Sequence, residues 1–184
     1  MGILEEKFLV TFNLKSNFIH YLNFPVSMTS TPNKLIYLDM DDVLCQYTKA
    51  HREALLENPK IQYPQSQYGF FRNLEPMKDA IFAVNYLRQQ SIFDVYILTA
   101  PSDKNPLCYT EKRLWIEDHL GFEMVERLII SPNKGLSMGD YLIDDHKTGR
   151  GQENFKGELL QFGTPDFENW QKVLNYFKVK YIRD

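Results

Sequence analysis

From residue 34 onward, short runs of strand-forming residues alternate with longer stretches of helical periodicity. The runs are LIYLD, DVYILT, RLII, YLID and ELLQF, and they are rich in Ile, Leu, Val, Tyr and Phe. This alternation is typical of βαβ units, in which consecutive strands lie parallel and helices cover the sheet. The sequence therefore predicts an α/β fold in which helices flank a parallel sheet.

Three of the intervening stretches carry apolar residues at helical spacing. We expect the first helix to begin at Pro76, because the missing N–H of a proline is not needed in the first turn. Its apolar stripe comprises Met77, Ile81, Val84 and Leu87.

The second stretch, YTEKRLWIEDHLG, is expected to pack through Leu114 and Trp115 and to end at Gly121 in a left-handed conformation. In the third, Thr164 is the expected N-cap and Pro165 the first helical residue. Its inward-facing residues are expected to be Phe167, Trp170, Leu174 and Phe177.

Length, charge and cysteine content narrow the class of protein. The 184 residues suffice for one domain with a substantial core. The net charge of -3, from 21 basic and 24 acidic residues, lacks the basic excess expected of a protein that binds a nucleic acid polymer. Cys45 and Cys108 form no CxxC pair, so neither a disulfide framework nor a structural zinc site is expected. A cytoplasmic location fits this composition best.

The first 33 residues differ from the rest of the chain. KFLVTFNL is compatible with an extra strand, but polar residues and prolines interrupt the segment, and no apolar run of about 18 residues is present to span a membrane. Met28 precedes a polar stretch and is an alternative start, which would make residues 1–27 an extension. We therefore expect residues 1–33 to be an extension or an extra strand and residues 34–184 to form the domain.

One segment, at about residues 46–75, departs from the alternation. It holds one expected helix and two prolines but no second strong strand. Long connections without regular structure are uncommon in compact domains unless they are functional. We expect a small helical cap inserted after the first core strand, although a long surface connection is the alternative.

Polar side chains follow the strand-forming runs at their carboxyl ends. Asp39 ends the first run, Thr99 the second, and the pair Asp144 and Asp145 the fourth, while Lys134 follows RLII. Because ligands of open parallel sheets bind beyond the carboxyl ends of the strands, we expect these side chains to converge there. Carboxylates crowded together resist joint ionisation unless a cation or shared protons relieve the repulsion. Carboxylates, a hydroxyl and an ammonium group suit phosphate chemistry with Mg²⁺.

The motifs YLDMDDVL, YILTAP, SPNKG and LIDD occur in the order found in the haloacid dehalogenase (HAD) superfamily of phosphatases, which this sequence resembles. The segments FFRNLEPMKDAI, YTEKRLWIEDHLG and GDYLIDD are similar to those of its 5'(3')-deoxyribonucleotidase branch. The resemblance covers about residues 34–178 and implies a Rossmann-like HAD fold with a small cap. It also implies a nucleoside monophosphate, most typically a deoxyribonucleoside monophosphate, as the substrate.

Carried onto matching positions, the resemblance implies that Asp39 attacks phosphorus and forms an aspartyl-phosphate. Asp41 would act as the general acid and base. Mg²⁺ would be held by Asp39, by the backbone carbonyl of Asp41 and by Asp144, with Asp145 supporting through water or hydrogen bonds.

The same resemblance assigns the phosphate-binding groups to Thr99, the Ala100 amide and Lys134. Tyr47 occupies a position where the branch carries an aromatic residue that stacks on the base, and Phe71 lies near the far end of the insertion. An aromatic wall would favour a flat ring. The alternative is that Tyr47 and Phe71 only pack the cap onto the sheet.

Three nearby residues are expected to have no catalytic role. Asp42 follows the second aspartate of the first motif and is expected to serve the turn geometry. His146 is excluded as a metal ligand because imidazole is a poor partner for Mg²⁺. Cys45 lacks a histidine partner and is expected to be buried by packing.

Two other functions are compatible with parts of the pattern. The same catalytic set would hydrolyse another small phosphate ester if the cap selected it. A receiver-like signalling domain also uses an acidic pair, an aspartate, a threonine and a lysine, but receivers place the acidic pair first, whereas here it comes last. The expected partner is a small nucleoside monophosphate, with no nucleic acid polymer and no membrane, and a homodimer is left open.

Overall fold

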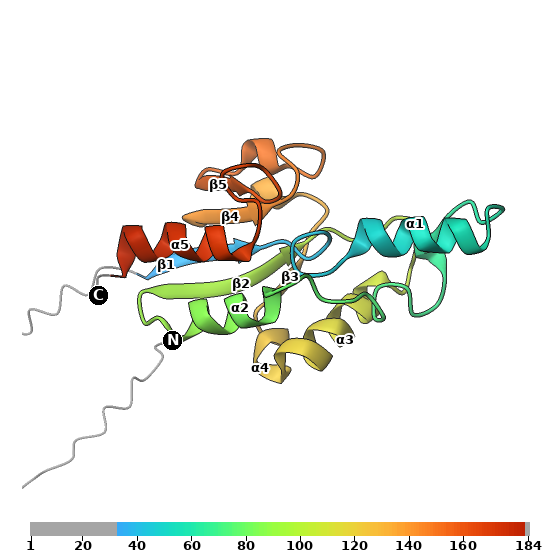
Figure 1. The fold of residues 1–184 in the computed structure, drawn as a ribbon, viewed down its shortest axis with the longest axis horizontal. Coiled ribbons are helices and arrows are strands. Elements are labelled where there is room, and N and C mark those ends of the chain that lie inside the picture. Colours follow the sequence, from blue (N-terminus) through green and yellow to red (C-terminus); the bar gives the residue numbers. More distant parts are fainter. Residues whose placement is uncertain (1–32, 183–184) are drawn as a thin grey trace, which may run out of the picture. The chain divides into compact units, whose positions relative to one another are not determined.

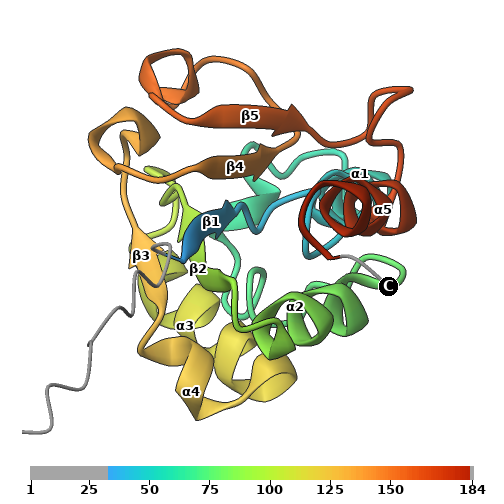
Figure 2. The ribbon, with the colours of Figure 1, turned by 90° about the vertical axis from the view of Figure 1, so that its left-hand side faces the viewer.

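The computed structural model describes residues 33–182 of the chain. Its core is a five-stranded sheet in the order β3-β2-β1-β4-β5, with every neighbouring pair parallel (Figures 1 and 2). The strands are β1 (Lys34–Leu38), β2 (Phe93–Thr99), β3 (Leu128–Ile130), β4 (Tyr141–Asp144) and β5 (Glu158–Gln161). These bounds confirm the predicted parallel sheet, and β1 lies at its centre between β2 and β4.

Helices occupy the connections between the strands and the segment after β5. The α-helices are α1 (Tyr47–Glu57), α2 (Ala80–Gln89), α3 (Cys108–Leu120), α4 (Phe122–Val125) and α5 (Trp170–Tyr181). Three short 3₁₀ helices complete the set: η1 (Pro64–Ser66), η2 (Lys134–Leu136) and η3 (Gln152–Asn154).

The sheet has a large core on one face and a smaller one on the other. Successive residues of β1 point to opposite faces, so Ile36 and Leu38 join the large core and Tyr37 the small one. The large core also holds Trp115 of α3 and Phe177 of α5, both fully buried. Burial of side chains of this size supplies most of the stability available to such a domain.

Two helices begin later than the sequence predicts. Helix α2 begins at Ala80 and not at Pro76, because the backbone N–H of Met77 donates to Leu44 O at 2.8 Å and holds this segment against the turn after β1. Residue Asp79, directly before the helix, has a φ of +64°. The expected stripe is otherwise retained, with Val84 and Leu87 fully buried.

Helix α5 begins at Trp170, so the prediction of Thr164 as its N-cap and Pro165 as its first residue is wrong. The cap is Asn169, whose side chain accepts a hydrogen bond from Lys172 N at 3.1 Å. Helix α3 ends at Gly121 as predicted, but with φ +84° and ψ 167°, which lies outside the left-handed helical region.

The segment between β1 and α2 contains α1 and η1, as expected for an insertion after the first strand. Figure 1 shows α1 beyond the carboxyl ends of β1 and β2. None of the residues of α1 is fully buried. The prediction made for residues 1–33 falls almost entirely outside the described residues. Within residues 33–182, no helix combines the length and apolar character that crossing a membrane requires.

Candidate active site

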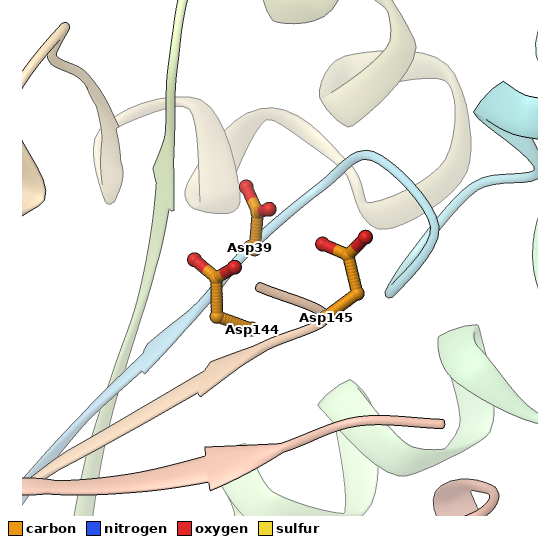
Figure 3. A group of neighbouring side chains, drawn as sticks. All are labelled: Asp39, Asp144 and Asp145. Atoms are coloured by element: carbon orange, nitrogen blue, oxygen red, sulfur yellow. The ribbon is translucent and has the colours of Figure 1, made fainter. Parts of the chain in front are cut away.

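Three carboxylates meet where β1 and β4 end. Asp39 directly follows β1, Asp144 is the last residue of β4, and Asp145 follows it. Because β1 and β4 are paired in parallel, their carboxyl ends lie side by side. Oxygen atoms of the three side chains lie within 4.8 Å of one another (Figure 3). The structure thus brings together the acidic residues that the sequence places at separate strand ends.

Lys134 partly neutralises this group of carboxylates. Its Nζ lies 2.7 Å from Asp39 Oδ1 and also contacts Asp144 Oδ2, and the side chain is 1% exposed. Burial by itself would lower the pKa of Lys134, but the charges of Asp39 and Asp144 outweigh it and raise that pKa. The lysine is therefore a permanent cation at the site. Its backbone N–H donates to Arg150 O at 2.7 Å, which holds η2 in place.

The two adjacent aspartates of the LIDD motif have different surroundings. Asp144 is fully buried, and its carboxylate accepts hydrogen bonds from Lys134, from Gln152 Nε2 at 3.1 and 3.2 Å, and from His146 N at 2.9 Å. Asp145 instead lines the cavity in front of β1 and β4. Burial and the nearby charge of Asp39 raise the pKa of Asp145 to about 7. Asp145 is therefore the more open of the two carboxylates.

Asp41 is paired with a second buried lysine, Lys112 of α3. Lys112 Nζ lies 2.8 Å from Asp41 Oδ2, 2.8 Å from Thr99 Oγ1 and 2.9 Å from Ala100 O. Its side chain is 0% exposed. Burial raises the pKa of Asp41, as does the charge of Asp39, while Lys112 opposes both effects. Asp41 thus holds a proton more readily than an ordinary aspartate.

Sequence reasoning did not assign a role to Lys112, although a signal was present. Lys112 lies on the buried stripe of α3 together with Cys108, Trp115 and Ile116. A lysine at a core position of an amphipathic helix requires a buried partner. Gln152, which holds Asp144, is the first residue of the short helix η3, whose sequence carries no comparable signal.

A cavity of about 250 Å³ opens in front of these side chains. Its walls include Asp39, Asp41, Tyr47, Phe71, Ala100, Lys134 and Asp145 from the predicted set, together with Gln65, Ser102, Arg150 and Gln152. Of the other predicted residues, Thr99 is fully buried with its hydroxyl directed to Lys112, and Asp144 lies behind Lys134.

The aromatic residues of the insertion form one wall of the cavity. Tyr47, the first residue of α1, stacks on Phe71 with ring centroids 6.0 Å apart and an interplanar angle of 21°. Phe71 is 1% exposed and so serves mainly as packing, whereas Tyr47 is half-buried. Phe70 meets Tyr47 edge-on at 5.7 Å. Tyr47 is therefore the ring better placed to meet a ligand.

The three residues without an expected catalytic role lie as follows. Asp42 has a φ of +54° and accepts hydrogen bonds from the Thr48 backbone N–H, at 2.9 Å, and from the Thr48 hydroxyl. Cys45 is fully buried, and burial raises the pKa of its thiol well above the ordinary value. His146 is exposed, with Nε2 3.3 Å from Asp145.

The donor set suits a hard divalent cation. Asp39 and Asp145 both present carboxylate oxygens to the cavity, and oxygen ligands are those that Mg²⁺ prefers. No histidine or cysteine belongs to the group of neighbouring acids at residues 39, 144 and 145. The site therefore fits magnesium better than a softer metal.

Comparisons with known proteins agree with these features. Residues 57–176 match the family described as "5' nucleotidase, deoxy (Pyrimidine), cytosolic type C protein". A Vibrio phage KVP40 protein named "Putative 5'(3')-deoxyribonucleotidase" is 42% identical over 151 residues, which cover 79% of this chain and 85% of that protein. The human 5'(3')-deoxyribonucleotidase, cytosolic type, is 45% identical over 85 residues, which cover 46% of this chain and 42% of the human protein.

The fold itself is also found among solved structures. The Bacillus subtilis HAD-hydrolase YfnB, solved with bound magnesium, superposes with a TM-score of 0.52 at 12% identity. The superposition covers 79% of this chain and 98% of that chain. The chain therefore has the fold of a HAD-hydrolase and belongs to the cytosolic type C 5'-nucleotidase family.

Proposed function

We propose that this chain is a Mg²⁺-dependent phosphatase that dephosphorylates nucleoside monophosphates, preferentially those with deoxyribose. The observation that carries the proposal is that Asp39, Asp41 and Lys134 all face one cavity at the carboxyl ends of parallel strands. The names of the relatives support the choice of substrate class.

Asp39 would be the nucleophile. One of its carboxylate oxygens would form a bond to phosphorus while the bond from phosphorus to the ester oxygen breaks, which leaves an aspartyl-phosphate. Asp41, two residues along the chain, would give its proton to the departing ester oxygen. Its raised pKa supports this role because the proton must be held until the transfer occurs.

Hydrolysis of the aspartyl-phosphate would use the same two residues. A water molecule would attack phosphorus and pass its proton to Asp41, and the Asp39 carboxylate would be released together with inorganic phosphate. Asp41 is then protonated again, as at the start of the cycle. Two neighbouring carboxylates thus divide the roles of nucleophile and general acid–base.

The phosphate oxygens would be held by Lys134, by the backbone N–H of Ala100 and by the hydroxyl of Thr99. Because Lys134 already lies 2.7 Å from Asp39, it would bring the phosphate and the nucleophile together despite their like charges. Thr99 Oγ1 accepts a hydrogen bond from Lys112, which leaves its own proton available for an acceptor.

The surroundings of the two late aspartates suggest a revised ligand set for the metal. We propose that Asp39, Asp145 and the backbone carbonyl of Asp41 hold Mg²⁺, and that Asp144 orients Lys134. This exchanges the roles that the sequence resemblance gave to Asp144 and Asp145, because the oxygens of Asp144 are engaged by Lys134, Gln152 and His146 N. Bound Mg²⁺ would neutralise charge on the carboxylates and on the phosphate.

The experiment is a phosphate-release screen with Mg²⁺ over ribo- and deoxyribonucleoside 5'- and 3'-monophosphates and several sugar phosphates. We expect turnover of the nucleotides, and loss of at least about 1,000-fold in kcat for Asp39→Asn and about 100-fold or more for Asp41→Asn. Asp118→Asn, an exposed acid on α3, is the matched control and should behave like the wild type. Retained activity in Asp39→Asn would show that another group attacks phosphorus, and a preference for sugar phosphates would assign a different substrate class.

A further inference from the structure

Helix α3 carries two buried charged residues in succession, Glu111 and Lys112, next to the site. We propose that Lys112 is a positioning residue that fixes the Asp41 carboxylate for proton transfer to the departing ester oxygen. This role rests on the proposed phosphatase function. Lys112 does not line the cavity, so it would act through the groups that it holds.

The hydrogen bonds of Lys112 use its full donor capacity. An ammonium group has three N–H donors, and Lys112 has three acceptors at 2.8 to 2.9 Å: Asp41 Oδ2, Thr99 Oγ1 and Ala100 O. These acceptors come from the turn after β1 and from the end of β2, so one cation joins two strand ends. A buried charge with all donors satisfied has a well-defined position, because any displacement leaves a donor unpaired.

Fixing Asp41 in this way has a direct chemical consequence. Lys112 binds Oδ2 of Asp41, while Oδ1 accepts only a long contact from the Cys45 thiol at 3.9 Å, so Oδ1 is the oxygen that can carry the proton that moves to the substrate. The bond to Ala100 O also holds the segment after β2, whose residues Ala100 and Pro101 line the cavity. General acid catalysis depends on the distance and angle of the proton donor, which makes such anchoring relevant to rate.

The position of Lys112 is itself fixed by its neighbours on α3. Glu111, 4% exposed, accepts the backbone N–H groups of Gly69 at 2.7 Å and Phe71 at 3.0 Å. Trp115 Nε1 donates to Leu74 O at 2.7 Å. The Lys112 ammonium group also lies 5.1 Å from the centroid of the Phe71 ring. Helix α3 is thereby attached to the segment from Gly69 to Leu74 at three points.

The proposal predicts a dependence on the leaving group. An alkoxide, as released from a nucleotide, needs the proton of Asp41, whereas p-nitrophenolate leaves readily without one. In Lys112→Met, which keeps the length of the side chain, we expect kcat/KM for a deoxyribonucleoside 5'-monophosphate to fall about 100-fold. For p-nitrophenyl phosphate we expect kcat/KM to fall less than about fivefold, because kcat/KM reports the steps up to the aspartyl-phosphate and so leaves out its hydrolysis, in which Asp41 serves both substrates alike.

Arg113→Met is the matched control, since it removes a charge from the next residue of α3. Arg113 is partly exposed and pairs with Glu117 on the same helix. We expect both of its rates to stay within about twofold of the wild type. The thermal unfolding midpoint of each variant is measured alongside the rates.

Several outcomes would overturn the inference. Equal losses of kcat/KM in Lys112→Met on the two substrates, or no loss on either, would show that Lys112 does not act through the proton donor. If Lys112→Met does not fold, Lys112→Gln, which retains a hydrogen-bond donor, is tested for the same difference between substrates. Failure of both variants to fold would make Lys112 a purely structural residue. A wild-type chain that releases phosphate from neither substrate would instead contradict the proposed function.

Discussion

At the residue scale, three of the four carboxylates of the site contact a buried lysine. Lys134 lies between Asp39 and Asp144, and Lys112 contacts Asp41. Burying an unpaired charge costs far more than burying a hydrogen-bonded pair. Because both lysines are nearly or fully buried, the burial of Asp39, Asp41 and Asp144 depends on them.

Tyr47 provides a test of how the cavity selects its substrate. Tyr47→Ala is expected to lower kcat/KM for nucleoside monophosphates about 10-fold, because stacking on a base contributes roughly 1 to 3 kcal/mol. Tyr47→Phe, which retains the ring, should stay close to the wild type. Steady-state kinetics on nucleotides and on p-nitrophenyl phosphate measure this, and similar losses of Tyr47→Ala on both would exclude stacking.

At the element scale, side chains connect β1 and β4 at both ends of the strands. At the carboxyl ends, Lys134 bridges Asp39 and Asp144. At the amino ends, Asp140 accepts hydrogen bonds from Lys34 Nζ at 2.8 Å and from Leu35 N at 2.9 Å. The backbone N–H of Asp140 also donates to Leu35 O at 2.9 Å. These contacts at the amino ends therefore stabilise the register that brings the carboxyl ends of β1 and β4 side by side.

The contribution of Asp140 should depend on pH. Its hydrogen bond with Lys34 lowers its pKa below the ordinary 3.8, so the stabilisation is present above that value and is lost as pH falls through the lowered pKa. The pair is partly exposed, so we expect Asp140→Asn to reduce the free energy of unfolding by only about 0.5 to 1 kcal/mol at pH 7. Urea unfolding at pH 7 and at about pH 3 measures the difference. A difference of equal size at both pH values would contradict this account.

At the scale of the whole molecule, the fold brings the carboxylates of Asp39, Asp144 and Asp145 together at the carboxyl ends of β1 and β4. A bound cation at this edge of the sheet would stabilise the folded state. Burial and the charge of Asp39 raise the pKa of Asp145, so its ionisation is unfavourable without a cation nearby. Bound Mg²⁺ would relieve this repulsion, and binding to the folded state alone would stabilise it.

Thermal unfolding with EDTA or with Mg²⁺ tests this view without using activity. Without metal at neutral pH, Asp145→Asn should unfold at a higher temperature than the wild type, because it removes one of the repelling charges. With Mg²⁺ at 100 times its Kd, the wild type should gain about 2.7 kcal/mol, and the variant much less. Asp118→Asn should follow the wild type in both conditions. A midpoint of the wild type that does not change with Mg²⁺ would argue against the metal site.

The class of fold, and the edge of the sheet at which the polar residues gather, are predictable from the amino-acid sequence. Strand-forming runs and helical stretches are local patterns, and the carboxyl end of a strand is known as soon as the strand is assigned. The sequence therefore assigns five residues to the carboxyl edge of the sheet: Asp39, Thr99, Lys134, Asp144 and Asp145. The first residues of α2 and α5 are harder to predict from the sequence. Helix α2 begins late because Met77 N donates to Leu44 O, and α5 begins late because Asn169 is its N-cap.

Which side chains face the cavity, and which lie behind it, depends on how the elements pack in three dimensions. Asp144 and Asp145 are neighbours of the same type, but successive residues at a strand end point to different sides, so one meets Lys134 and the other the cavity. Lys112 reaches Asp41 from 71 residues away along the chain. Such a contact depends on how α3 packs against the sheet. A local pattern of residues does not predict a contact between positions so far apart in the sequence.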